Sequence, residues 1–359
     1  MKKIRFGVLS TARIGVQNVI PAMQKGEHTE VVAIASRSAE KGREVAQYLG
    51  IPRWHGSYEA LLADLDVDAI YNPLPNDQHV LWSIRALEAG KHVLCEKPIA
   101  LSAAEGGVLV EATRHHHHLK VMEALMYRHH PQWRKAKELV ENGQIGELRA
   151  IQVFFSFYND DPDNIRNSSS KGGGALMDIG CYASSLSRWL FNSEPQRVFG
   201  LLKDDPRFGV DRLASAILDF GVGDATFTCS TQVAPLQRAY VAGNEGHIEL
   251  YRAAFNPPND RPCVIRVMRG GKIDQLEVQM CDQYGIMADR FTEAILNRAP
   301  VPVPLEDAVR NMEVIDAIVA SSCGGSWVRP GTAQFEPDLE CEDRTEIRSS
   351  RDALLLHAR

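Results

Sequence analysis

Three side chains in two short motifs could take part in one reaction. Lys97 lies in CEKP at positions 95–98, directly after an apolar run typical of a strand. Asp178 and Tyr182 lie in GGGALMDIGCY at positions 172–182, four residues apart, so on a helix they share one face. An ammonium, a carboxylate and a phenol can hold and move the proton of a substrate hydroxyl. Their use in one reaction requires a fold that brings the two motifs together.

The chemistry that suits these groups is hydride transfer at an alcohol carbon. Oxidation needs a base for the hydroxyl proton, and a cation that stabilises the developing oxyanion while the hydride passes to a nicotinamide. Tyr182 is a poor base at the ordinary phenol pKa of about 10, but a nearby ammonium favours phenolate. We therefore expect Lys97 to lower the pKa of Tyr182, and Asp178 to orient the substrate or the lysine. In the reverse direction Tyr182 would donate the proton. A simpler alternative for Asp178 is a first-turn acid favoured by the helix dipole.

The first part of the chain shows the alternation of a nucleotide-binding domain. Short β-branched runs alternate with amphipathic stretches that end at Gly50 and Gly90, which suit helix C-caps. The runs are IRFGVL, VVAIAS, DAIYNPL, HVLCEK and KVMEALM. They predict an α/β fold over residues 1–126, a Rossmann doubly wound parallel sheet with helices on both faces. Lys97 then follows a parallel strand at the edge where ligands of such sheets bind, and it can lie over a nicotinamide.

After residue 127 the pattern changes to that of an α+β domain. Period-two apolar runs separated by Gly, Asn or Asp turns predict one large, mainly antiparallel open sheet. The expected strands are RAIQVFFSFY, QRVFGLL, ASAILDF, DATFTCS, AYVAGN, GHIELY, CVIRVMR and DQLEVQM. Helices are expected at QWRKAKELVENG and over 174–191, 283–297 and 305–322. We assign residues 127–330 to this second domain. Residues 331–359 form a polar tail, expected to be mobile, with a short docking helix as the alternative.

A loop after the first strand could bind the pyrophosphate of a dinucleotide. STARIG, at positions 10–15, opens a helix where such folds have G-x-G-x-x-G. Ser10 and Ala12 replace two of the three glycines but are small enough for the tight turn, and the helix N-terminus favours the phosphate charge. An ordinary strand-turn-helix with small residues is the alternative. The expected cofactor contacts in this loop are Ser10, Thr11, Ala12, Arg13 and Ile14.

The end of the second strand favours NADP over NAD. NAD enzymes usually place a carboxylate there for the ribose hydroxyls, but Ser36 occupies this position. Arg37 can stack on the adenine and pair with the 2′-phosphate, and Ser36 and Ser38 can donate hydrogen bonds to it. The alternative is an ordinary solvated arginine after a strand.

Bulk properties point to a small-molecule partner. The 359 residues suffice for two domains, and 44% hydrophobic and 24% charged content is that of a globular protein. A net charge of −6 gives no basic field for nucleic acid or anionic membrane, and no apolar stretch could span a bilayer. The seven scattered cysteines without a CxxC pair suit reduced thiols, so we expect a cytoplasmic protein. We expect no metal, because four consecutive residues such as His115–His118 cannot all ligate one ion. A solvated helix end is the expected role of that run.

Taken together, these motifs resemble the Gfo/Idh/MocA family of oxidoreductases. The resemblance covers residues 3–330, and EKP together with GGGALMDIGCY is its specific part. The other segments that match are STARIG, YNPLPNDQH (71–79), AGKHVLCEKP (89–98), MEALMYRHHP (122–131) and VPLEDAVRNMEVIDA (303–317). It implies a Rossmann domain joined to an α/β domain, a substrate site between them, and an open sheet that often forms the oligomer interface. A homodimer or homotetramer through that sheet is therefore expected.

The resemblance also implies roles for individual residues. Lys97 matches the catalytic lysine, and Asp178 and Tyr182 match the polar pair of the second motif. Further cofactor contacts are implied for Pro73, Asn76, His79, Glu96 and Lys97, with Glu96 near the nicotinamide ribose. Substrate contacts are implied for Tyr127, Arg128, His130, Asn164, Arg166, Asp178 and Tyr182. Single histidines such as His79 and His130 are more often packing residues, and His130 has the better case through its motif position.

The residue type at position 182 indicates which substrate class to expect. Inositol dehydrogenases of the family have histidine there, whereas sugar and dihydrodiol members have tyrosine. We expect an NADP-dependent oxidoreductase that oxidises an aldose such as D-xylose or glucose at C1. The alternatives are a trans-dihydrodiol dehydrogenase and an NADPH-dependent reductase of a keto or anhydro sugar. A sensor of NADP or sugars that regulates transcription is the non-enzyme alternative, although a sensor would be expected to have lost part of the catalytic set.

Overall fold

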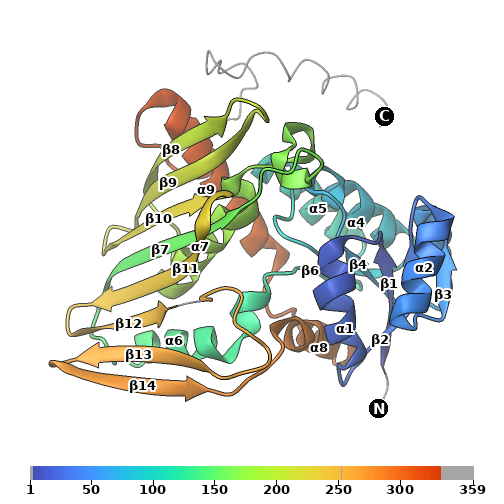
Figure 1. Ribbon diagram of the computed structural model, residues 1–359, viewed down its shortest axis with the longest axis horizontal. Helices are drawn as coiled ribbons and strands as arrows, with labels where there is room; N and C mark the ends of the chain where they lie inside the picture. The colour runs from blue at the N-terminus through green and yellow to red at the C-terminus, as the bar shows by residue number, and fades with distance from the viewer. Residues whose placement is uncertain (1–2, 252, 333–359) are drawn as a thin grey trace.

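The computed structural model describes residues 3–251 and 253–332, and it contains two sheets flanked by helices (Figure 1). The tail predicted for 331–359 lies outside the described residues from position 333 onward. A parallel sheet formed by the first third of the chain is joined to a larger, mainly antiparallel sheet. The fold class expected from the sequence is confirmed.

Within the described residues the first sheet has six parallel strands in the order β3-β2-β1-β4-β5-β6. The strands are β1 (Ile4–Leu9), β2 (Thr29–Ala35), β3 (Arg53–His55), β4 (Ala69–Asn72), β5 (His92–Cys95) and β6 (Val121–Glu123). The helices are α1 (Ile20–Gln24), α2 (Ala39–Leu49), α3 (Tyr58–Leu62), α4 (His79–Glu88) and α5 (Ala103–His115). β3 was not expected, because RWH is short and polar and has no apolar run. α2, α3 and α5 begin where a serine hydroxyl accepts a backbone N–H, at Ser38, Ser57 and Ser102.

The second sheet has the order β14-β13-β12-β11-β7-β10-β9-β8, and its pairs are antiparallel except for β7 with β10. The strands are β7 (Leu148–Tyr158), β8 (Arg197–Asp205), β9 (Val210–Asp219), β10 (Asp224–Ser230), β11 (Gln232–Gly243), β12 (Gly246–Tyr251), β13 (Cys263–Arg269) and β14 (Lys272–Val278). Inward side chains alternate along β7, where Ile151, Val153 and Phe155 are buried. The helices of this part are α6 (Pro131–Glu141), α7 (Cys181–Phe191), α8 (Gln283–Leu296) and α9 (Leu305–Gly324).

The last two helices connect the two sheets. The ring of Phe291 on α8 lies 6.4 Å from that of Phe6 on β1, and both side chains are buried. Asp289, also on α8, accepts the backbone N–H groups that precede β2. On α9, Asp316 accepts the N–H of Ala103 at the start of α5. The domain division at 126 stays a prediction, because α8 and α9 follow the second sheet in sequence but pack against the first part of the chain.

Three structural features relate to the predictions about membrane spans, disulfides and the histidine run. Among the described residues, no helix is both long and apolar enough to cross a lipid bilayer. Cys95, Cys181, Cys229, Cys263 and Cys281 are free thiols. α5 ends at His115, and His117 and His118 are exposed, as expected for a solvated helix end.

Candidate active site

Three loops of the first sheet meet at one edge. STARIG follows β1, YNPLPN spans the end of β4, and CEKP follows β5. Since β1, β4 and β5 are parallel neighbours, their carboxyl ends lie together, which is where doubly wound folds bind ligands. The amide of Asn76 donates to the carbonyl of Gly172 across 2.8 Å, so the GGGALMDIGCY segment lies against this edge.

Lys97 and Asp178 form a buried ion pair between the two parts of the chain. The Lys97 ammonium donates to the Asp178 carbonyl oxygen at 2.6 Å and to its carboxylate Oδ1 at 2.9 Å. The other carboxylate oxygen, Oδ2, accepts from Nε of Arg166 at 2.6 Å. Both oxygens of Asp178 therefore have a cationic partner, and the structure brings Lys97, Asp178 and Arg166 together as expected.

Pairing keeps these groups charged despite their burial. Burial by itself raises the pKa of Asp178, but Arg166 and then Lys97 outweigh it and hold that pKa well below its usual range. Burial likewise lowers the pKa of Lys97, but the charge of Asp178 outweighs it and the pKa is raised. Asp178 is thus more than a first-turn acid, since it fixes the ammonium in place.

Tyr182 packs directly against the lysine. The Lys97 Nζ atom lies 5.1 Å from the centre of the Tyr182 ring, over its face, and the Tyr182 hydroxyl donates to the sulfur of Met126 at 3.4 Å. The rings of Phe155 and Phe255 lie 5.8 and 5.5 Å from that of Tyr182. Ammonium and phenol therefore meet, as the sequence predicted.

The expected effect of Lys97 on the phenol is wrong in this structure. Burial raises the pKa of Tyr182 well above its ordinary value, and Tyr284, Cys181, Glu96 and Asp178 add to the rise. The Lys97 ammonium lies over the ring and is paired with Asp178, and the net pKa of the phenol stays raised. Tyr182 is therefore a protonated phenol, suited to donating a proton.

The turn that carries Asp178 is not ordinary α-helix. Instead of one helix over 174–191, the chain forms a π-helical turn over Leu176–Gly180, followed by α7. The amide of Asn311 on α9 donates to the carbonyl of Cys181 at this junction. Such turns occur frequently at functional sites, since the extra residue changes which groups face the ligand. A second π-helical turn, Gly15–Val19, lies in the cofactor loop.

The cofactor loop has the shape that a pyrophosphate needs. Ser10 adopts a positive φ of 74°, and its hydroxyl accepts the N–H of Ala12, which closes the turn before the helix begins at Arg13. A Cβ atom added at Gly15 would lie 3.5 Å from the Tyr71 ring and 3.7 Å from Pro73, so it would fill the space between the loop and these side chains. Arg13 points along the helix, where its Nε donates to Gln17. These residues, with Thr11 and Ile14, fit a dinucleotide.

The end of β2 has serine hydroxyls and an arginine where an NAD enzyme has a carboxylate. Ser36 accepts the N–H of Ser38, and Ser38 caps α2 by accepting the N–H of Lys41. The Arg37 side chain is exposed. This set fits a 2′-phosphate, because every side chain in it can donate a hydrogen bond.

Of two further residues predicted to bind the cofactor, Glu96 lies at the site and His79 lies in the interior. Glu96 lies next to Lys97 at the edge of the sheet, where its carboxylate accepts a hydrogen bond from the Tyr71 hydroxyl at 2.7 Å. Burial raises the pKa of Glu96, although Lys97 and Tyr71 oppose the rise. His79 was predicted to bind the cofactor, but it is buried and its ring nitrogens lie 2.7 and 2.8 Å from the carbonyl oxygens of Pro98 and Leu74. It therefore offers no nitrogen to a ligand and instead links the CEKP loop to the YNPLPN loop.

Three residues predicted to bind substrate lie in the interior. The Tyr127 hydroxyl is hydrogen-bonded to Ser185 at 2.8 Å, and the Arg128 guanidinium pairs with Asp307 at 2.9 Å. His130 accepts the N–H of Gln132 as the N-cap of α6, and burial lowers its pKa to about 4. Internal contacts therefore engage the polar groups of Tyr127 and Arg128, whereas Nε2 of His130 is buried and has no hydrogen-bond partner among the described residues.

Both residues predicted to bind substrate in the loop before the second motif make contacts within the protein, and their contacts with a substrate stay predictions. Arg166 reaches Asp178, whereas the Asn164 side chain accepts the N–H of Arg166 and shapes the loop. Sequence reasoning missed Tyr71, Tyr284, Phe155 and Phe255. Tyr71 had a signal, since it begins YNPLPN, but the others lie in a helix, a strand and a turn with no chemical motif. Among the described residues, no group of three His, Cys, Asp or Glu side chains could hold a metal ion.

Comparison with known proteins gives the family. Residues 4–124 match the model of the oxidoreductase family with an NAD-binding Rossmann fold, and residues 133–249 match the GFO/IDH/MocA C-terminal domain. A D-xylose 1-dehydrogenase (NADP(+)) of Haloferax volcanii is 38% identical over 325 residues, 90% of this chain and 98% of the relative. A dTDP-3,4-didehydro-2,6-dideoxy-alpha-D-glucose 3-reductase of Streptomyces violaceoruber is 37% identical over 301 residues, 82% of this chain and 86% of the relative.

Solved structures agree with these relatives. A 3-ketoreductase from Actinomadura kijaniata, in complex with NADP and TDP-benzene, superposes with a TM-score of 0.83 at 31% identity, over 89% of this chain and 98% of that one. An aldose-aldose oxidoreductase from Caulobacter crescentus gives 0.85 at 28% identity, over 91% and 100%. Fold and site define a dinucleotide-dependent oxidoreductase that acts on CH–OH groups of sugar-related substrates. The chain belongs to the Gfo/Idh/MocA family.

Removal of the central carboxylate should make Lys97 easier to deprotonate. In Asp178→Asn, burial and the charge of Arg166 still lower the pKa of Lys97, while the charge that raises it is gone. We expect the labelling of Lys97 by acetic anhydride, followed by mass spectrometry across pH, to begin at lower pH than in the wild type. Asp163→Asn, in the exposed loop before Asn164, is the control. An unchanged labelling profile in Asp178→Asn would contradict the role given to this ion pair.

Proposed function

We propose that the protein is an NADP-dependent aldose 1-dehydrogenase that oxidises a sugar of the D-xylose or glucose type at C1 to its lactone. The observation that carries the proposal is the meeting of Lys97, Asp178 and Tyr182 at the edge of the nucleotide-binding sheet. The relative from Haloferax volcanii, named a D-xylose 1-dehydrogenase (NADP(+)), supports this substrate class. Its alignment covers nearly the whole length of both chains.

The cationic and the phenolic side chain have different roles in the proposed reaction. When bound, the nicotinamide accepts or supplies the hydride. Lys97 stabilises negative charge on the substrate oxygen, and Tyr182 exchanges the proton with that oxygen. Asp178 holds the ammonium in place, and Arg166 binds the other carboxylate oxygen of Asp178. Because the Arg166 side chain is partly exposed, its remaining nitrogens can bind a further sugar hydroxyl. Asn76 and Glu96 complete the cofactor side of the site.

The state of Tyr182 makes the direction of reaction pH-dependent. Carbonyl reduction uses the phenol, which the raised pKa keeps protonated, whereas alcohol oxidation needs the phenolate. Oxidation should therefore accelerate as pH rises, while reduction should not. This favours a second candidate function, an NADPH-dependent reductase of a keto sugar, which the dTDP-sugar 3-reductase relatives also support. A trans-1,2-dihydrobenzene-1,2-diol dehydrogenase of Mus musculus, 31% identical over 254 residues, keeps diol oxidation as a third possibility.

An assay in both directions tests this function. NADP+ with D-xylose, D-glucose or a trans-dihydrodiol, and NADPH with keto sugars, are followed by absorbance of the reduced cofactor. We expect turnover of an aldose, with kcat for oxidation rising with pH. Lys97→Met and Tyr182→Phe should each lower kcat by about a thousandfold or more while NADPH binding is retained, since proton transfer and charge stabilisation together supply factors of this size.

The matched control for the phenol is Tyr158→Phe, because Tyr158 is exposed on β7. Near-normal kcat in both Lys97→Met and Tyr182→Phe would remove these residues from the chemistry. Turnover of keto sugars alone would select the second candidate function.

Cofactor choice is proposed to depend on the end of β2. Ser36, Arg37 and Ser38 stand where a carboxylate would bind the ribose of NAD, which favours NADP. Arg37→Asp should reverse the preference, because the new carboxylate repels a 2′-phosphate and can accept the ribose hydroxyls of NAD+. The ratio of kcat/KM for NADP+ to that for NAD+ is expected to fall by about a hundredfold, as for loss of a charge-assisted pair. An unchanged ratio would refute the assignment.

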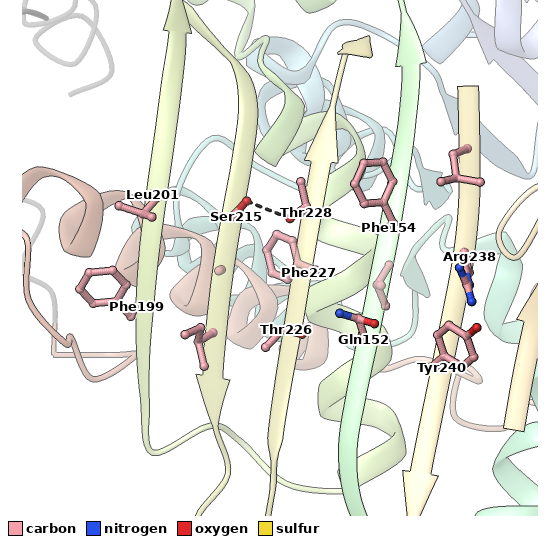
Figure 2. Close-up of a pocket in the computed structure, with 14 residues that line it drawn as sticks. Gln152, Phe154, Phe199, Leu201, Ser215, Thr226, Phe227, Thr228, Arg238 and Tyr240 are labelled. Carbon is pink, nitrogen blue, oxygen red and sulfur yellow. Dashed lines mark hydrogen bonds between the residues drawn. The ribbon is translucent and has the colours of Figure 1, made fainter. Parts of the chain in front are cut away.

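We also propose that two or four copies associate through the outer face of the large sheet. Figure 2 shows this face, where Leu201 and Phe154 lie on either side of the hydrogen-bonded pair Ser215 and Thr228, whose hydroxyl oxygens are 2.9 Å apart. Helices α7 and α9 pack on the other face. Exposed apolar side chains such as Leu201, Ile217 and Leu236 favour a covered surface.

Light scattering of the purified protein tests the association. The wild type is expected at the mass of a dimer or tetramer, and Ile217→Lys at a smaller mass, because a charge is placed in an apolar interface. Val222→Lys, in the exposed turn between β9 and β10, is the control. A monomeric wild type would rule out the interface.

A further inference from the structure

The end of strand β6 closes the loop that carries the lysine of CEKP. β5 and β6 are paired in parallel up to Cys95 and Glu123. Directly beyond, the N–H of Ala124 donates to the carbonyl of Cys95 at 2.7 Å. The carboxylate oxygen Oε1 of Glu123 accepts the N–H of Ile99 at 2.8 Å. Both ends of the loop 96–98 are therefore held by one short segment at the end of β6.

The bond to Glu123 satisfies a backbone group that lies in the interior. Ile99 is fully buried, and among the described residues its N–H has no acceptor other than Glu123. Buried backbone N–H groups are almost always paired in folded proteins. Loss of the Glu123 oxygen would leave this donor without a partner, which favours a shift of the loop toward another acceptor.

A carboxyl group is an expensive way to make one hydrogen bond. The Glu123 residue is 2% exposed, and its second oxygen, Oε2, has no hydrogen-bond partner among the described residues. Burial raises the pKa of Glu123 to about 7, although the N–H of Ile99 opposes the rise. The carboxyl is therefore partly protonated near neutral pH, and its carbonyl oxygen can accept the bond in either form. The position thus needs an acceptor oxygen at this reach rather than a charge.

We propose that Glu123 is a positioning residue, which places the Lys97 ammonium by holding the backbone of its loop. Lys97 lies two residues before Ile99, and its ammonium contacts two oxygens of Asp178 at 2.6 and 2.9 Å. A loop released at Ile99 would move the ammonium away from these oxygens. The inference rests on the catalytic role proposed for Lys97, and it adds to that role a residue outside both chemical motifs.

Three substitutions separate the acceptor oxygen from the charge and from the volume of the side chain. Glu123→Gln keeps an acceptor oxygen at the same reach but removes the charge. Glu123→Asp keeps the charge but is one methylene shorter, and Glu123→Leu removes the acceptor and leaves an apolar side chain of similar size. Asp219→Leu is the matched control, because Asp219 also accepts a backbone N–H, that of Gly221 at 2.8 Å, in the turn between β9 and β10. The melting temperature of each protein reports general destabilisation.

The first readout is kcat in the assay of sugar turnover. Glu123→Leu and Glu123→Asp are expected to lower kcat by about tenfold or more, because a misplacement of about 1 Å can cost about a hundredfold. Glu123→Gln should stay close to the wild type, and so should Asp219→Leu even if its melting temperature falls.

The second readout is the labelling of Lys97 by acetic anhydride across pH, which needs no substrate. Labelling should begin at lower pH in Glu123→Leu and Glu123→Asp than in the wild type. An ammonium that has moved away from Asp178 loses the charge that raises its pKa, whereas burial still lowers that pKa. The profile of Glu123→Gln should match that of the wild type.

Labelling profiles of Glu123→Leu and Glu123→Asp that match the wild type would overturn the inference, whatever their kcat. Losses in Glu123→Gln as large as in Glu123→Leu would also overturn it, since they would assign the role to the charge. The same changes in Asp219→Leu would assign them to general destabilisation. If the wild type turns over no sugar, the proposed function fails, and the labelling profiles alone decide the inference.

Discussion

The ion pair between Lys97 and Asp178 is the contact on which the rest of the site depends. It joins the end of a parallel strand to the first turn of a helix that is 81 positions further along the chain. Burial of two charges is costly, and such pairs often add little to stability. Here the cost is offset by Arg166, which occupies the second carboxylate oxygen, and by the carbonyl of Asp178, which accepts from the same ammonium. The arrangement is better understood as preparation for charge on a substrate oxygen than as a source of folding energy.

The surrounding architecture keeps this pair in place. α8 packs on β1 through Phe291 and Phe6, and α9 holds both α5 and the π-helical turn, through Asp316 and Asn311. Tyr127 binds Ser185 on α7 and Arg128 binds Asp307 on α9, and these contacts tie the helix bearing Tyr182 to its neighbours. Burial of the phenol, to which the rings of Phe155 and Phe255 contribute, raises its pKa, so the resting group is a proton donor.

Much of the fold and of the candidate site could be predicted from the sequence, because the signals for them are local. Strands β10, β12 and β13 coincide with apolar runs between turn residues, and Lys97, Asp178 and Tyr182 were located by motif. The failures have physical reasons. β3 is too short and polar to show a periodic pattern of apolar residues. A π-helical turn differs from an α-helix in the register of its backbone hydrogen bonds, and the spacing of apolar residues does not reveal that difference. His79, Tyr127, Arg128 and His130 lie in matched segments, but sequence does not tell a side chain that faces the ligand from one that supports the loop. The pKa of Tyr182 depends on burial and on the partner of Lys97, both set by distant segments.

The measurement that tests the account most directly is a crystal structure of the complex with NADP+ and D-xylose. The account predicts that the oxygen on C1 of the sugar lies within hydrogen-bond distance of both the Lys97 ammonium and the Tyr182 hydroxyl, with Asp178 still in contact with the lysine. A sugar bound away from this pair, or one that touches Tyr182 while Lys97 points elsewhere, would contradict it.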